Sequence, residues 1–182
     1  MNRIIMMLLI LCNSALLYAQ TYTLKAKDYD GKTQYFVFKE NNSSDEIWGI
    51  KTEYSGMVYS ADMWFNSFPG RTGTYKVEFS VVLEPDGDPE YEVKAGSRRI
   101  KKGRYPYSGD SRNCEGGSTK KCVLNLGEHK INKGEKIKVC GTSVYYCQDK
   151  DGKWHGAFTR WYELKFTKDN SNLKKSGTSN LE

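Results

Sequence analysis

The feature that most constrains the fold is a strict two-residue alternation of apolar and polar side chains. Residues 75–81 read YKVEFSV, which places four apolar side chains on one face of an extended chain and three polar ones on the other. Successive side chains of a β-strand point to opposite faces of its sheet, so this pattern predicts a half-buried strand. Similar alternation occurs at residues 22–26, 91–95, 137–139 and 158–166, and no segment after residue 19 shows the apolar repeat of an amphipathic helix.

Turn-forming residues separate these runs. Pairs that end in glycine begin at Asp30, Pro69, Asp86, Lys133 and Asp151. Such pairs are typical of the tight turns that connect neighbouring strands. Many short strands with turns between them indicate an all-β fold, and we expect an antiparallel two-sheet β-sandwich.

The N-terminus has the layout of a cleavable signal peptide. Arg3 precedes an apolar run over residues 4–17, and the bond after Ala19 is the best cleavage point. The run is too short and too interrupted to remain as a membrane-spanning helix, so we expect no transmembrane anchor. We expect a secreted, extracellular protein, or a periplasmic one in a Gram-negative bacterium. The chain divides into a signal peptide (1–19), a sandwich domain (20–167) and a disordered polar tail (168–182).

Four cysteines remain once the signal peptide is removed: Cys114, Cys122, Cys140 and Cys147. An even number of cysteines in an exported chain predicts two disulfide bonds. Of the three pairings, we favour Cys114 with Cys122 and Cys140 with Cys147, because they close the shortest loops. The first bond would tie down a long loop in the basic, glycine-rich segment 96–121. Zinc is the alternative, but the cysteine spacings are longer than those usual in structural zinc sites.

The net charge and the absence of catalytic motifs exclude several classes of function. The formal net charge is +6, from 28 Lys and Arg against 22 Asp and Glu, which is moderate and, with export, argues against nucleic acid as a partner. Such a surface favours acidic glycans, anionic polymers or membrane surfaces, although solubility alone also explains it. The chain has two histidines and no serine-hydrolase or zinc-protease motif, so we expect no enzymatic activity. A glycosidase needs only two carboxylates, and that alternative stays open on sequence alone.

The order of several short segments is similar to that of one known family. In chain order the segments are GTYKVEF (73–79), EPDG (84–87), YEV (91–93), LG (126–127), KGEKIKV (133–139) and AFTRWYEL (157–164). Together they resemble the galactose-binding-like sandwiches of carbohydrate-binding modules, the type found in secreted bacterial polysaccharide hydrolases. The resemblance implies a jelly-roll sandwich that binds carbohydrate. We expect a polysaccharide and, given the basic surface, one with acidic groups.

Two features depart from this family. Its members often begin with a Glu-Ala-Glu segment that helps to hold a structural calcium ion, whereas this chain has Lys25-Ala26-Lys27-Asp28. A lysine ammonium cannot coordinate a cation, so that calcium site is lost or rebuilt. The cysteines and the long loop are also unusual. The second hypothesis is therefore a secreted protein-interaction module, such as an adhesin, inhibitor or effector, on the same fold.

Candidate ligand-binding residues are aromatic side chains in predicted loops, because flat aromatic faces stack on the C–H groups of pyranose rings. Trp154, in a polar turn, is the strongest candidate, and the others are Trp64 with Asn66, Tyr105, Tyr107 and Tyr146. The alternative for each aromatic is packing in the core.

Two charged segments are further candidates. Arg98 and Arg99 begin a basic run that we expect to pair with acidic groups of a glycan, the alternative being a solvated strand edge. Glu84, Asp86 and Asp88 alternate along one predicted loop and would suit a calcium ion, the alternative being a charged hairpin turn.

Overall fold

The computed structural model describes residues 19–33, 37–39, 47–50, 60–106 and 119–168. Most of the predicted signal peptide, the tail beyond residue 168, Tyr107 and Cys114 lie outside these residues. Within them, no helix has the length and the apolar character needed to span a membrane.

Most of the described chain is β-strand, as the alternation predicts. The single helix of the described residues is the 3-10 turn η1 (Ala26–Asp28). The strands are β1 (Thr21–Lys25), β2 (Gly31–Lys32), β3 (Val37–Lys39), β4 (Trp48–Ile50), β5 (Ser60–Phe65), β6 (Gly73–Leu83), β7 (Glu90–Ala95), β8 (Arg98–Arg104), β9 (Lys120–Ile131), β10 (Ile137–Gln148) and β11 (Trp154–Lys168). All pairings between these strands are antiparallel, which confirms the predicted class.

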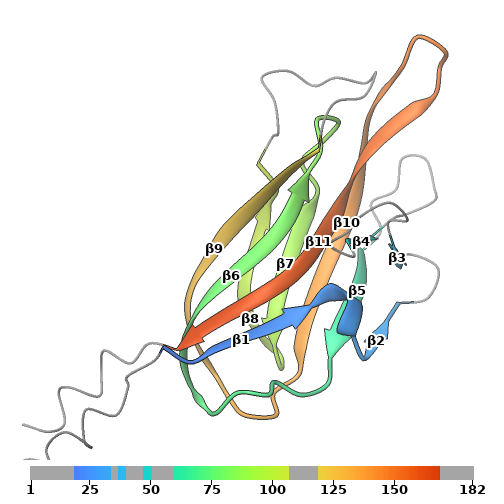
Figure 1. The fold of residues 1–182 in the computed structure, drawn as a ribbon. Coiled ribbons are helices and arrows are strands. Elements are labelled where there is room, and N and C mark those ends of the chain that lie inside the picture. The colour runs from blue at the N-terminus through green and yellow to red at the C-terminus, as the bar shows by residue number, and fades with distance from the viewer. Residues whose placement is uncertain (1–18, 34–36, 40–46, 51–59, 107–118, 169–182) are drawn as a thin grey trace, which may run out of the picture.

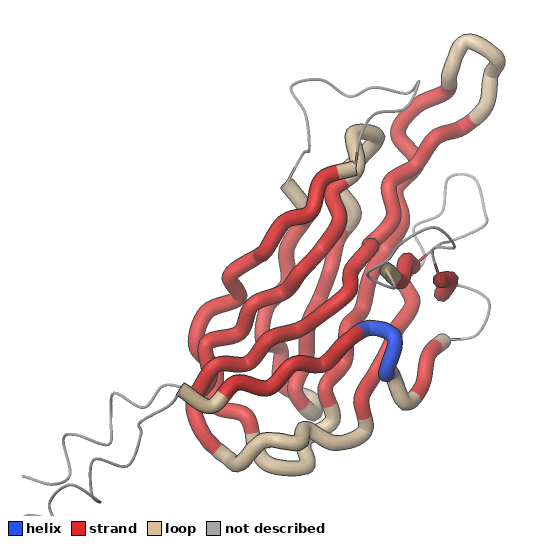
Figure 2. The backbone as a smooth tube through the Cα atoms, in the orientation of Figure 1, coloured by secondary structure: helices blue, strands red, loops and turns tan. Residues whose placement is uncertain are grey.

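The strands form two layers (Figures 1 and 2). The first layer has the order β1-β11-β6-β9, with the short strands β4 and β3 beside one part of β11. The second layer has the order β2-β5-β10-β7-β8. The strands β10 and β11 also pair with each other, so one hydrogen-bonded system of eleven strands runs through both layers.

The core lies between the layers and contains the apolar halves of the alternating strands. Tyr75, Val77, Phe79 and Val81 of β6 are all fully buried. The ring of Phe79 contacts that of Trp161 on β11, with ring centroids 5.7 Å apart. Burying one large apolar side chain contributes roughly 1.5–3 kcal/mol, and a one-residue slip would turn a whole strand inside out. The core therefore fixes the register of the strands and, with it, which side chains face outward.

The outer parts of β10 and β11 form a hairpin that projects beyond the rest of the sandwich (Figure 1). At its tip, the Asp149 carboxylate accepts hydrogen bonds from the backbone N–H groups of Asp151 (3.0 Å) and Lys153 (2.8 Å). The same carboxylate contacts His155 Nε2 at 2.7 Å. Gly152 has a φ of 77°, a left-handed conformation that favours glycine. These contacts give the tip a defined turn.

The predicted disulfide bonds are not formed among the described residues. Cys122 and Cys140 are free thiols, so the predicted bond between Cys122 and Cys114 is absent. Cys140 and Cys147 lie on the same strand, β10. Seven residues of extended strand span about 23 Å, whereas the Cα atoms of a disulfide lie about 4.4–6.8 Å apart. The prediction of a Cys140–Cys147 bond was therefore wrong, because loop length was judged before the strand was known.

Candidate functional site

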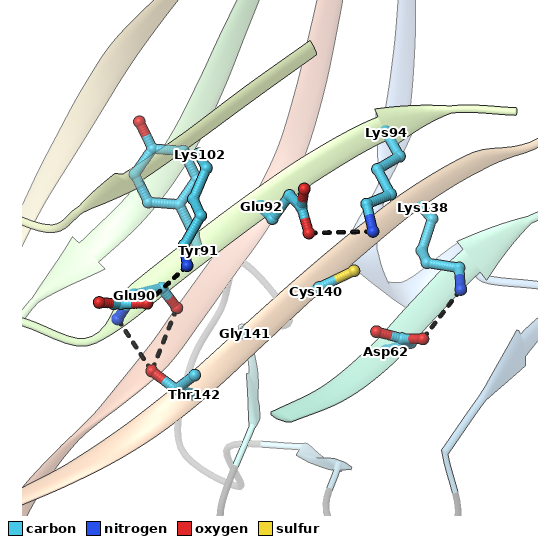
Figure 3. Close-up of a pocket in the computed structure, with 10 residues that line it drawn as sticks. All are labelled: Asp62, Glu90, Tyr91, Glu92, Lys94, Lys102, Lys138, Cys140, Gly141 and Thr142. Carbon is cyan, nitrogen blue, oxygen red and sulfur yellow. Dashed lines mark hydrogen bonds and ion pairs between the residues drawn. The ribbon is translucent and has the colours of Figure 1, made fainter. Parts of the chain in front are cut away.

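An open groove with a cavity volume of about 340 Å³ crosses the outer face of the second layer. Its floor is the part of β10 that carries Cys140 and Thr142, and its walls are β5 on one side and β7 and β8 on the other (Figure 3). The lining residues are Asp62, Glu90, Tyr91, Glu92, Lys94, Lys102, Lys138, Cys140, Gly141 and Thr142.

Strand register arranges the outward side chains of this face in rows that cross the strands. The first row reads Trp64, Lys138, Lys94 and Arg99, on β5, β10, β7 and β8. The second row, two residues further along β10, reads Asp62, Cys140, Glu92 and Lys102. Three cations therefore stand side by side in the first row, and like charges in such positions repel one another. The carboxylates of the second row offset this repulsion.

Each lysine of the groove is paired with a carboxylate. Lys138 lies 2.9 Å from Asp62, Lys94 lies 3.0 Å from Glu92, and Lys102 lies 3.1 Å from Glu90 (Figure 3). The groove is thus lined by three acidic and three basic side chains. Its charge is balanced, and donors alternate with acceptors along its walls.

These pairs keep the carboxylates ionised. A hydrogen bond from Lys102 lowers the pKa of Glu90 below its usual value. Burial raises the pKa of Glu92, but hydrogen bonds from Arg99 and Lys94 outweigh burial and lower the pKa overall. Burial likewise opposes the net lowering of the pKa of Asp62, which hydrogen bonds from Cys140 and Lys138 produce.

The floor of the groove presents a thiol and a hydroxyl. Burial, together with a hydrogen bond to Asp62, raises the pKa of the Cys140 thiol to about 12, so this cysteine stays protonated. The hydroxyl of Thr142 accepts a hydrogen bond from the backbone N–H of Glu90 at 2.9 Å and lies 3.4 Å from the Glu90 carbonyl oxygen. The floor is therefore polar but chemically unreactive.

The predicted residues Trp64 and Asn66 lie beside this groove. The half-buried indole of Trp64 stands in the first row, directly across from Lys138, and the ammonium of Lys136 lies 4.5 Å from its ring centroid. Asn66 is exposed, and its backbone N–H donates to the Asp30 carboxylate at 2.6 Å. The strand register therefore places Trp64 next to Lys138 at one end of the groove, and Asn66 follows directly after the end of β5.

The predicted basic run separates into two directions. Arg99 lies 2.5 Å from Glu92 and so reaches the edge of the groove. Arg98 instead donates to the carbonyl oxygen of Lys130 and lies 3.9 Å from Glu135. The basic run forms β8, the edge strand of the second layer. Carboxylates of the protein partly compensate its charges.

The other predicted aromatic residues have different surroundings. Tyr105 is 2% exposed, and its hydroxyl donates to the carbonyl oxygen of Arg160 at 3.1 Å, so its ring belongs to the core and is not available to a ligand. Tyr146 and Trp154 lie on the strands of the projecting hairpin, and the structure describes their backbone only. Tyr107 is outside the described residues.

The three predicted calcium ligands do not converge on a cation site. Glu84, 5% exposed, lies 2.8 Å from the Arg160 guanidinium, and Asp88 lies 3.6 Å from that of Arg104. A bridge between Glu84 and Gly87 closes the segment as a hairpin turn, which is the alternative that the sequence offered. Within the described residues, no group of three metal-ligating side chains is suitably placed.

The segment that corresponds to the family's calcium site does not fit a calcium ion either. It holds Lys25, Ala26, Lys27 and Asp28, of which Ala26 is buried and Asp28 is exposed. Two ammonium groups and one carboxylate are an unsuitable ligand set for a cation that prefers several oxygen ligands.

The residues that line the groove were not among the predicted site residues. They are the polar halves of the alternating strands, for example the glutamates and lysine of EYEVKA in β7. The apolar halves of the same strands define the core and are the part of the pattern that predicts it. The sequence signal for this groove is a charged residue at every outward position of β7 and β8. The pairing of the two strands was needed to show that these charges lie together.

A scan against protein-family models finds no match, and neither does a search of curated proteins. Solved structures with a similar fold do exist. A family 6 carbohydrate-binding module, studied for its binding subsites, matches over 81% of this chain and 94% of that chain, with a TM-score of 0.51 and 8% identity. The GH26-CBM35 β-(1,4)-mannanase of Podospora anserina matches over 82% of this chain and 28% of that chain, with a TM-score of 0.50 and 13% identity. The insecticidal crystal protein Cry2Aa matches over 82% of this chain and 21% of that chain, with a TM-score of 0.54 and 10% identity.

The matches define the class of the fold as a galactose-binding-like β-sandwich. More specifically, the chain has the fold of the carbohydrate-binding modules of families 6 and 35, which confirms the resemblance seen in the order of its segments. The chain corresponds to nearly the whole family 6 module but to under a third of the other two proteins. At identities of 8–13% the likeness extends to the fold alone.

Proposed function

We propose that this protein is a secreted, non-catalytic carbohydrate-binding protein that holds a polysaccharide in the groove along β10. The observation that carries the proposal is a groove of balanced charge on the outer face of a carbohydrate-binding-module fold. The signal-peptide pattern of residues 1–19 supports secretion.

The chemistry of the groove suits a polyhydroxylated ligand. A sugar hydroxyl both donates and accepts a hydrogen bond, so it is well satisfied between a carboxylate and an ammonium group. The pairs of Asp62 with Lys138 and Glu92 with Lys94 supply such neighbours on both sides of β10. A groove on an open sheet face also accepts a chain that continues beyond it, as a polysaccharide does.

The same groups are poorly suited to hydrolysis of the bound sugar. A glycosidase needs one carboxyl group whose pKa is raised, so that it can donate a proton near neutral pH. The pKa values of Asp62, Glu90 and Glu92 are all lowered by their paired lysines and arginines. This argues for binding without catalysis.

The test is retention of the mature protein, without the signal peptide, on a panel of immobilised neutral and acidic polysaccharides. We expect Glu92→Ala to weaken binding by about tenfold or more, because hydrogen bonds to charged groups contribute roughly 1.5–3 kcal/mol. The matched control is Glu78→Ala, since Glu78 lies on the first layer and has similar ion pairs with Lys76 (2.8 Å) and Lys165 (3.7 Å). Equal affinities of the two variants, with both proteins folded, would contradict the groove as the binding site.

Trp154 and Tyr146 remain predictions as stacking residues of the projecting hairpin. Trp154→Ala tests them on the same panel. Unchanged retention of this variant would remove the hairpin from the sugar-binding surface and leave the groove as the site.

The hairpin itself favours a second candidate function, protein binding. A projecting hairpin with a tip fixed by Asp149 is a surface that can enter a cleft of another protein. Capture of a specific protein that is lost when residues 149–153 are replaced by a Gly-Ser linker, without any retention on polysaccharides, would favour this function over the first.

A further inference from the structure

The end of the groove at Trp64 differs in charge from the rest. Each lysine that lines the groove has a carboxylate partner at 2.9–3.1 Å. The ammonium of Lys136 has no carboxylate partner among the described residues, and it lies 4.5 Å from the ring centroid of Trp64. An exposed ammonium over an aromatic face is held by the ring's quadrupole, a weak attraction that an anion can readily exceed.

The indole of Trp64 has a fixed position. It lies against Gly31 of β2, its cross-strand neighbour, so closely that a Cβ atom on residue 31 would come within 2.4 Å of the ring. Real Cβ atoms do not approach so closely, so the ring position depends on glycine at this place. A glycine that makes room for an aromatic ring is a site of close packing, and here it fixes the place of the ring against β2.

At this end the ammonium of Lys136 lies over the indole of Trp64, and Lys138 is the cross-strand neighbour of Trp64 on β10. The ammonium of Lys138 forms an ion pair with Asp62. Arg99 and Lys94 continue the same row of cations on the far side of Lys138. This end of the face therefore has an ammonium, that of Lys136, without a carboxylate partner among the described residues, whereas each lysine of the groove has one.

We propose that Trp64, Lys136 and Lys138 form a subsite for a sugar residue that carries a carboxylate, and that Lys136 sets the preference for acidic over neutral sugars. The inference rests on the proposed function and identifies the ligand class of one end of the same groove. The sugar ring stacks on the indole, and its carboxylate pairs with Lys136. A neutral sugar has to displace the ammonium from the indole and offers it no counter-ion, whereas an acidic sugar supplies one.

The test uses two polymers with one backbone: homogalacturonan with free carboxylates and the same polymer with its carboxylates methyl-esterified. Binding of both to the full mature protein is measured by isothermal titration calorimetry at low and high salt. We expect the wild type to bind the free acid about tenfold or more tightly, since one charge-assisted pair distinguishes the two. Salt should reduce this preference.

The informative variant is Lys136→Ala. We expect it to lose affinity for the acidic polymer, to bind the esterified one at least as well as the wild type, and so to lose the preference. The matched control is Lys121→Ala, because Lys121 lies over Tyr162 at 5.7 Å on the first layer and should leave both affinities unchanged. Trp64→Ala should weaken the binding of both polymers.

The outcomes separate the subsite from the function. Equal binding of the two polymers by the wild type, or a preference kept by Lys136→Ala, overturns the subsite and leaves polysaccharide binding in place. Retention of other polysaccharides through Glu92 without binding of the free acid also overturns the subsite alone. Failure to bind any polysaccharide overturns both the function and the subsite.

Discussion

The packing of Gly141 gives the sharpest test of the described fold. This residue lies on β10 between the two side chains that form the groove floor, and it faces the first layer. A Cβ atom on residue 141 would lie 2.5 Å from Cβ of Thr159 and 2.7 Å from Cδ1 of Ile50. Gly141→Ala therefore inserts a methyl group where the two layers are in closest contact.

Thr159 cannot easily move away from that methyl group. Its hydroxyl accepts a hydrogen bond from the backbone N–H of Thr142 at 3.1 Å and lies 2.8 and 3.0 Å from the carbonyl oxygens of Thr142 and Glu90. Overpacking costs about 1–3 kcal/mol, and loss of one of these hydrogen bonds adds about 1 kcal/mol. The reduced freedom of the unfolded chain returns about 0.4–1 kcal/mol. The expected net destabilisation is about 1–3.5 kcal/mol.

The assay is urea unfolding, followed by intrinsic fluorescence, of the wild type and of Gly141→Ala. We expect a lower midpoint with an unchanged m-value, and a Tm lower by about 5–10 °C. The control is Gly73→Ala, where the new Cβ meets only the flexible end of Lys168 at 3.1 Å, so the free energy of unfolding should change by less than about 1 kcal/mol. If Gly141→Ala unfolds at the wild-type midpoint, the layers are not packed as described.

Four further predictions test separate features. Tyr105→Phe should lose about 1 kcal/mol of stability, because it removes the buried hydrogen bond to the Arg160 carbonyl, and should bind polysaccharide as the wild type does, as thermal unfolding and retention assays can show. Cys140 should resist alkylation at pH 8 in the native protein and react after unfolding, as peptide mass spectrometry can check, because its thiol has a pKa of about 12. A folded-state pKa of Glu92 below the unfolded value means that its stabilisation is present at neutral pH and is lost as the pH falls through the folded pKa, so Glu92→Gln should flatten the acid limb of the stability profile below about pH 4. Asp149→Ala should speed amide hydrogen exchange at Asp151 and Lys153 and leave exchange in β6 unchanged.

The class of the fold could be predicted because the periodicity of the strands reports directly on a core. The alternating positions of β6 that were predicted to be buried, such as Val77 and Phe79, are fully buried. The disulfide bonds could not be predicted in the same way. Whether Cys140 and Cys147 can approach depends on whether the chain between them turns, and a cysteine spacing does not report that turn.

The site was predicted only in part, since exposure of an aromatic residue depends on tertiary packing. Trp64 and Tyr105 were predicted on the same ground, as aromatic side chains available to a ligand. One stands at the end of the groove, whereas the other is enclosed by Phe79 and Tyr91 at ring distances of 6.4 and 5.6 Å. The two residues differ in exposure because different neighbouring strands cover them. Which strands are neighbours depends on the order of the strands in the sheets.

The groove arises from a size difference between neighbouring strands. The outward positions of β10 that form its floor hold Cys140 and Thr142, whereas the flanking strands carry Asp62, Glu90 and Glu92 at the positions across from them. Long side chains beside short ones on a flat sheet leave a channel along the short ones, in the direction of the strand. The channel runs along β10 because this strand pairs on both sides within the second layer, so both walls are present. A strand at the edge, such as β8, has described neighbours on one side and therefore offers charge without a channel. Of the two arginines that suggested a binding surface in the sequence, Arg99 thus lies at the rim of the proposed site, and the less conspicuous outward positions of β10 form its floor.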